Sequence, residues 1–182
     1  MSLTDAERER AVLFLRQTKA QVLEGTAGLT SEQWRFKPAP SAWSPCECIA
    51  HLALVETGLL RTVQGLANTP EAPADVLAQI AGKDDLLVRM IRSRKNRVQA
   101  PAEAHPPSAS LDPVEIIGRF SLVRDRSIEY LETTGDPLRS RVHPHFILGP
   151  FDGYQWMLFL GAHAERHLRQ IQEAKEHSDF PR

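Results

Sequence analysis

Apolar residues recur every three or four positions along four long stretches of the chain, which is the spacing of one face of a helix. These stretches cover about residues 4–23, 44–64, 112–133 and 154–175. A fifth, shorter stretch of the same kind covers about residues 83–98. No segment shows the sustained alternation of apolar and polar residues that is typical of strands. The pattern therefore predicts four main helices and one minor helix.

Capping motifs mark where these helices begin. Ser44 suits the N-cap, Pro45 suits the first helical position and Glu47 completes a capping box. A similar box stands at residues 4–7, and Asp112 begins the third long helix in the same way. These local signals place the helix starts within a residue or two.

Proline and glycine fill the segments between the predicted helices. Residues 29–43 and 99–110 are proline-rich, and residues 141–153 are expected to form a loop. A long link between helices favours a crossover over a simple hairpin. A chain of 182 residues suits one domain with a full core. We therefore predict an all-α fold, a four-helix bundle with long crossover connections and one minor helix, as a single domain over residues 1–182.

Composition excludes several classes of protein. The net charge is −1, so nucleic acid and anionic membranes are not expected partners. No apolar run reaches the roughly 20 residues that span a bilayer, and the polar start does not resemble a signal peptide. Cys46 and Cys48 match no common zinc spacing, and we expect both to be reduced and packed, with a reactive Cys46 as the alternative. A cytoplasmic location is expected.

The last long helix carries two histidines on its apolar face. His163 and His167 are four residues apart, so their rings lie one turn apart on the side that also holds Phe159 and Ile171. A buried polar ring without a partner costs on the order of a few kcal/mol. A metal ion bound by both rings would be such a partner, although a backbone carbonyl would serve as well. A metal site needs a third ligand.

His51 supplies that third ligand, because it borders the apolar stripe of the strongly capped second helix. Facing helices of a bundle are where metal sites are built. Three imidazoles leave a coordination position open, and an open position is typical of reactive rather than structural sites. We therefore predict His51, His163 and His167 as metal ligands.

Other polar residues near these positions are candidates for the pocket. Glu47 could bind an imidazole N–H or act only as the helix cap, and Gln170 could donate to a ligand or satisfy a polar spot in the core. His145, with His143, could line the entrance or be solvated. Arg124 could reach the interior or extend to solvent.

Two motifs carry a resemblance to a known family. The first is Trp43-Ser44-Pro45-x-Glu47-x-x-x-His51-Leu52. The second is Gln155-Trp156-x-x-Phe159, continued by Ala162-His163-Ala164-Glu165-Arg166-His167-Leu168-Arg169-Gln170-Ile171. Their order and spacing resemble the DinB/YfiT-like superfamily over nearly the full length. The resemblance implies a four-helix bundle with a divalent metal held by three histidines, which match His51, His163 and His167.

The resemblance also implies a range of functions. Relatives include transferases and isomerases that use low-molecular-weight thiols, so we expect a metal-dependent transferase with a small thiol as cosubstrate and a small-molecule substrate. A metal-dependent hydrolase and a non-catalytic, stress-related metal- or ligand-binding bundle are the alternatives. Zinc or nickel is expected, with iron or manganese as alternatives. Several relatives are dimers, which makes a homodimer an expectation. No catalytic residue is assigned.

Overall fold

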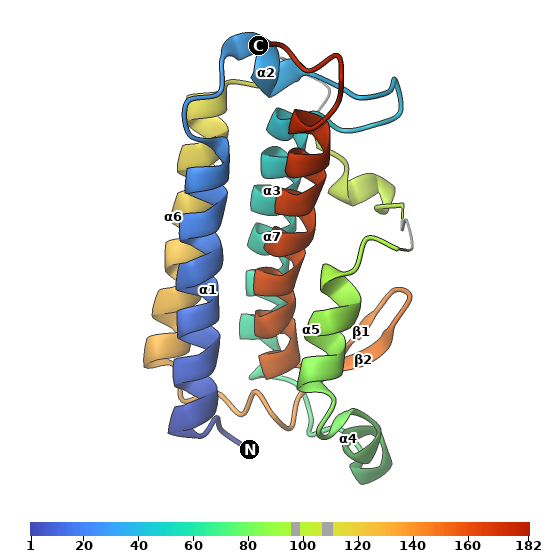
Figure 1. The fold of residues 1–182 in the computed structure, drawn as a ribbon. Helices are drawn as coiled ribbons and strands as arrows, with labels where there is room; N and C mark the ends of the chain where they lie inside the picture. The colour runs from blue at the N-terminus through green and yellow to red at the C-terminus, as the bar shows by residue number, and fades with distance from the viewer. Residues whose placement is uncertain (96–98, 107–110) are drawn as a thin grey trace.

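Four long helices run side by side and form a bundle (Figure 1). The structure, a computed structural model, describes residues 1–95, 99–106 and 111–182. The long helices are α1 (Asp5–Thr26), α3 (Pro45–Leu66), α6 (Pro113–Thr133) and α7 (Gly153–Lys175). Helices α1 and α3 each pack against both α6 and α7. The consecutive helices α6 and α7 therefore lie across a diagonal, and the chain between them crosses the end of the bundle. The predicted four-helix bundle is confirmed.

Shorter elements cover the ends and one side of the bundle. They are α2 (Ser31–Arg35), α4 (Ala74–Ile80), α5 (Asp84–Arg92) and the 3₁₀ helix η1 (Ala102–Ala104). The prediction of a single minor helix undercounted these elements, because α2 and η1 lie in the proline-rich segments over residues 29–43 and 99–110, and no element was predicted over the residues of α4. The predicted helix over residues 83–98 corresponds to α5 but ends at Arg92, and residues 96–98 lie outside the described residues.

The expected loop over residues 141–153 contains an antiparallel hairpin of β1 (Val142–His145) and β2 (Gly149–Asp152). Pro144 pairs with Pro150 in its register. Proline is depleted in strands because it cannot donate to the ladder, and each strand has only four residues. The hairpin therefore produces no period-two signal in the sequence.

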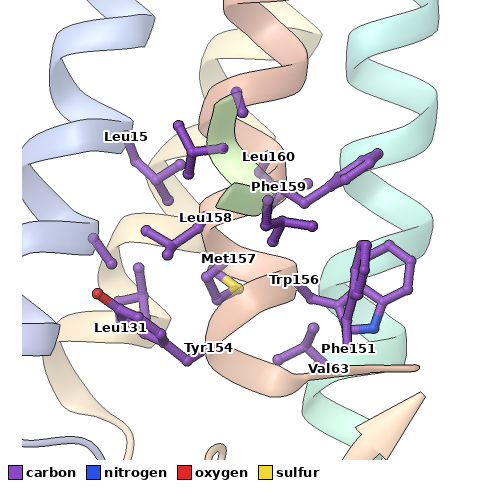
Figure 2. Close-up of a cluster of buried hydrophobic side chains, with 14 of the residues drawn as sticks. Leu15, Val63, Leu131, Phe151, Tyr154, Trp156, Met157, Leu158, Phe159 and Leu160 are labelled. Atoms are coloured by element: carbon purple, nitrogen blue, oxygen red, sulfur yellow. The ribbon is translucent and has the colours of Figure 1, made fainter. Parts of the chain in front are cut away.

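Helix α7 is the central element of the core. Every residue from 153 to 162 is buried, and many of their side chains belong to the apolar cluster in Figure 2. A Cβ atom on Gly161 would lie 2.6 Å from the ring of Phe14 on α1. The glycine therefore allows α1 to pack closely against α7 two residues before the first predicted ligand histidine, His163.

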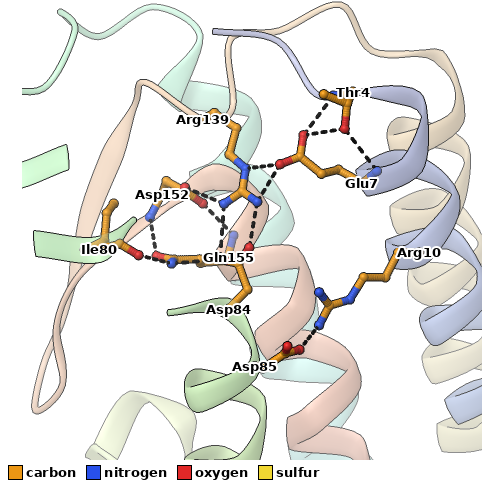
Figure 3. A network of polar contacts seen from close by, with 9 residues as sticks. All are labelled: Thr4, Glu7, Arg10, Ile80, Asp84, Asp85, Arg139, Asp152 and Gln155. Atoms are coloured by element: carbon orange, nitrogen blue, oxygen red, sulfur yellow. Dashed lines mark hydrogen bonds and ion pairs between the residues drawn. The ribbon is translucent and has the colours of Figure 1, made fainter. Parts of the chain in front are cut away.

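A polar network fixes the start of α7 (Figure 3). The guanidinium of Arg139 bonds Glu7 on α1, Asp84 on α5 and Asp152, the N-cap of α7. Burial raises the pKa of Asp152 to about 6, and Gln155 completes its capping box. The network joins α1 and α5 to the helix that carries two predicted ligands. No helix in the described ranges is long and apolar enough to cross a membrane.

Candidate metal centre

The rings of His51, His163 and His167 meet between α3 and α7. The Nε2 atom of His163 lies 3.2 Å from Nε2 of His51 and 3.1 Å from Nε2 of His167. One potential ligand atom from each of the three rings lies within 4.8 Å of the others. The structure therefore brings together the three residues that the sequence singled out.

This spacing fits a metal ion. Zinc binds imidazole nitrogen at about 2.0–2.1 Å, so two nitrogens in a tetrahedral site are about 3.3–3.4 Å apart. The observed separations of 3.1 and 3.2 Å differ from that value by only a few tenths of an ångström. Hydrogen bonds alone explain the arrangement less well, because Nε2 of His163 can donate only one proton and has two close nitrogen neighbours.

The backbone of η1 sets the tautomer of His51. Nδ1 of His51 lies 2.6 Å from the carbonyl oxygen of Ala104. A carbonyl only accepts, so Nδ1 carries the proton and Nε2 keeps a free lone pair directed at the other two rings. A ligand histidine in a metal site typically has such a partner on its second nitrogen.

Burial keeps all three imidazoles in the neutral form that binds metal. Desolvation lowers the pKa of His51 and lowers the pKa values of His163 and His167 well below their usual range. The mutual proximity of the rings acts in the same direction, since a charge on one ring disfavours a charge on the next. The three rings are therefore neutral near pH 7, and their lone pairs are available as ligands.

These pKa shifts predict how the metal-free protein responds to acid. A histidine with a lowered pKa in the folded state takes up protons preferentially when the chain unfolds, so stability is full above about pH 6.5 and falls as pH decreases. Asp152, with its raised pKa, acts in the opposite direction. We therefore expect the thermal midpoint of the metal-free protein to fall between pH 7 and 5 and to fall less in a His163→Ala variant. Equal slopes for the two proteins would contradict the prediction.

Aromatic rings enclose the centre on two sides. The indole of Trp43 lies 4.7 Å from the ring of His51 and stacks at 5.8 Å on His167. Phe159 stacks at 5.0 Å on His163. The sequence pointed to Trp43 only as a member of the first motif and gave it no role at the metal centre. The exposed ring of His105, which the sequence did not single out, contacts the edge of Trp43.

Comparison with known proteins shows the family to which this chain belongs. The sequence matches the family profile of the DinB superfamily over residues 14–171. The chain belongs to the DinB superfamily. No curated protein matches the sequence. The solved structure of YfiT from Bacillus subtilis, described as a probable metal-dependent hydrolase with an unusual four-helix bundle topology, is similar with a TM-score of 0.65 at 16% identity. The match covers 99% of this chain and 92% of YfiT, and at that identity it shows the fold alone.

Glu47 caps its helix in this DinB-superfamily chain. One carboxylate oxygen accepts from the backbone N–H of Ser44 at 2.8 Å, and the other lies 2.7 Å from Nζ of Lys37. The imidazole N–H of His51 is instead bound by Ala104. Of the two roles that the sequence allowed for Glu47, the structure shows the cap.

Gln170 and His145 lie around the centre without joining it. The Gln170 side chain accepts a hydrogen bond from Arg94 at 3.1 Å. It also interacts with His167, which offsets a small part of the lowering of the pKa of that ring by burial. Nδ1 of His145 accepts two backbone N–H groups of the hairpin turn, and burial lowers its pKa to about 4. Its ring lies 5.6 Å from that of Phe159, so a single aromatic ring separates it from the centre.

The remaining candidates have structural surroundings. Cys46 and Cys48 are buried and unbonded to each other. Burial raises the pKa of the Cys46 thiol to about 11 and that of Cys48 further, which makes neither a nucleophile near neutral pH. His143 is exposed, and its backbone carbonyl accepts from the indole N–H of Trp156.

A buried ion pair lies between the four long helices. Arg124 of α6 is 0% exposed and binds Glu56 of α3, which is 2% exposed, with N···O distances of 2.8–3.0 Å. The same guanidinium donates to Leu15 and Thr18 on α1 and to the carbonyl of Leu160 on α7. The sequence left the direction of Arg124 open and did not indicate Glu56.

Proposed function

We propose that this chain is a divalent-metal-dependent enzyme in which His51, His163 and His167 hold the ion. The observation that supports the proposal is the approach of their Nε2 atoms to 3.1 and 3.2 Å. Three protein ligands leave a position for an exogenous molecule, as in catalytic zinc sites. The family membership and the probable metal-dependent activity in the description of YfiT are consistent with it.

The residues around the centre prepare it for such a role. A divalent ion bound there would lower the pKa of a thiol or of water taken up at the open position. The Ala104 carbonyl holds the proton of His51 on the far nitrogen, away from the ligand lone pair. Trp43 and Phe159 cover ligand rings and limit access of bulk water to them.

We further propose that the activated molecule is a low-molecular-weight thiol and that the reaction is a transfer. In the part of the chain that the structure describes, the cluster of potential ligands contains no carboxylate. Histidine-ligated zinc hydrolases commonly place a glutamate beside the metal as general base, whereas a thiol ionised by metal coordination is already a nucleophile. Glu165, on the helix that carries two ligands, is paired with Arg92. Hydrolysis is the second candidate, which the description of YfiT favours.

Reconstitution tests the proposal in two steps. We expect about one divalent ion per chain after loading with zinc or nickel at about pH 8, where imidazoles are neutral. Elemental analysis that finds no bound ion would remove the metal centre.

The loaded protein is then offered a panel of electrophilic small molecules with and without a small thiol. Turnover that requires the thiol supports transfer, and turnover in its absence supports hydrolysis. The metal-free protein, mixed with the same thiol and electrophile, is the control for a reaction that proceeds in solution without the metal centre. The thiol-dependent turnover should be lost in this sample. Absence of turnover over the whole panel would contradict an enzymatic role.

A further inference from the structure

The buried pair of Glu56 and Arg124 has no part in the chemistry proposed above, but it lies close to the metal centre along both ligand helices. Glu56 follows His51 by five residues on α3, which is about 7.5 Å along a helix. Leu160, whose carbonyl accepts from Arg124, precedes His163 by three residues, or about 4.5 Å. The pair therefore joins the two ligand helices within about one and a half turns of the centre.

We propose that this pair is a positioning device that fixes α3 against α7 so that the three imidazoles reach one ion, an inference that depends on the proposed metal centre. The guanidinium of Arg124 donates to the carbonyl of Leu160 and so reaches across the diagonal from α6 to α7. It also bonds Glu56 on α3 and Thr18 on α1, so that one planar group is held by all four long helices.

Directional bonds explain why a charged pair would stand where apolar side chains could pack. Replacing a buried ion pair by apolar residues of similar volume is often neutral or stabilising, so stability alone does not account for it. Apolar cores tolerate repacking with small shifts of the backbone, whereas metal ligands must hold their distances to within a few tenths of an ångström. The planar fork of arginine restricts distance and angle together.

The double variant Glu56→Met/Arg124→Met separates positioning from stability. It leaves no partner unsatisfied, because the Thr18 hydroxyl also bonds the carbonyl of Phe14 and the other acceptors are helix carbonyls. We expect the thermal midpoint of the metal-free double variant to match that of the wild type or exceed it. We expect its affinity for Co²⁺, measured by titration with the visible spectrum as readout, to fall at least about tenfold, comparable to the loss of an outer-shell partner.

A matched control replaces another ion pair between helices. The double variant Arg16→Met/Glu132→Met removes the exposed pair between α1 and α6 and should bind Co²⁺ as the wild type does. If the buried double variant also binds Co²⁺ within about twofold of the wild type, the positioning role is wrong. If that variant does not fold, Arg124→Lys is used instead, since lysine keeps the charge but loses the fork. Wild-type affinity in that variant would overturn the inference equally.

A second readout needs no metal. Faster amide hydrogen exchange in residues 160–164 of the metal-free Glu56→Met/Arg124→Met variant, with global stability unchanged, would support positioning. If the wild type binds no Co²⁺, the proposed function fails, but this exchange measurement still tests whether the pair orders α7 beside His163. Unchanged exchange at these amides would then overturn the inference independently of any metal.

Discussion

Replacing His163 by alanine is expected to abolish metal binding while leaving the bundle folded. Its Nε2 atom lies 3.2 Å from that of His51 and 3.1 Å from that of His167, so its loss separates the two remaining ligands. Loss of an outer-shell partner alone typically costs 10–100-fold in metal affinity, and we expect loss of a ligand to cost more than about 100-fold. Competition titration with a chromophoric chelator measures the affinity, and circular dichroism of the metal-free protein measures folding.

The matched control is His143→Ala. His143 is exposed on β1, and its ring lies 6.1 Å from that of Trp156, outside the cluster of three ligand rings. That variant should bind the ion with wild-type affinity. Retention of wild-type affinity by the His163→Ala variant would show that the three rings meet for a reason other than metal binding. Unfolding of that variant would show that the ring has a structural role.

The sequence predicted those features of the molecule that depend on local geometry. Apolar spacing and caps defined the four long helices, because both signals lie within a few residues of each helix. Ser44 and Glu47 form the expected capping box. The spacing of His163 and His167 follows directly from the helix repeat, and the choice of His51 needed only the expectation that α3 and α7 face each other.

Features made by distant parts of the chain were beyond such reasoning. The imidazole of His51 bonds the backbone carbonyl of Ala104, 53 residues away. Any type of residue could supply such a carbonyl, so the sequence gives no sign of it. Trp43 gave a signal only as a member of a motif, and its stacking on two ligand rings depends on the path of the loop before α3. The proline-containing hairpin gave no strand pattern. The homodimer and the cytoplasmic location stay predictions.

The helix faces themselves were predicted less well near the buried ion pair. Helical spacing of apolar residues favours Val55 and Leu59 for the inner face of α3, yet both are only partly buried, whereas Glu56 beside them is 2% exposed. A glutamate is almost never fully buried unless it is paired. Its partner Arg124 comes from another helix, so the sequence pattern of α3 alone could not place Glu56 inside.

Truncating one member of that pair is expected to produce the largest loss of stability in the chain. Arg124→Ala leaves the carboxylate of Glu56, which is 2% exposed, without the guanidinium that binds both of its oxygens. Breaking a buried pair in this way typically costs about 3–5 kcal/mol. For a protein of this size, that corresponds to a fall of about 6–20 °C in thermal midpoint, since each kcal/mol shifts the midpoint by about 2–4 °C. Urea unfolding of the metal-free protein at pH 7 measures the free energy.

The comparison with an exposed pair shows what the effect depends on. Arg119 pairs with Glu115 one turn away on α6, and both side chains are more than half exposed. Because exposed helix pairs contribute about 0.3–0.5 kcal/mol, Arg119→Ala should leave unfolding nearly unchanged. The cost of Arg124→Ala arises from the charge that stays behind, so adding Glu56→Met to Arg124→Met should recover most of the stability that Arg124→Met alone loses. An Arg124→Ala variant as stable as Arg119→Ala would mean that water reaches Glu56. The inference that the pair of Glu56 and Arg124 holds the four long helices in position would then be wrong.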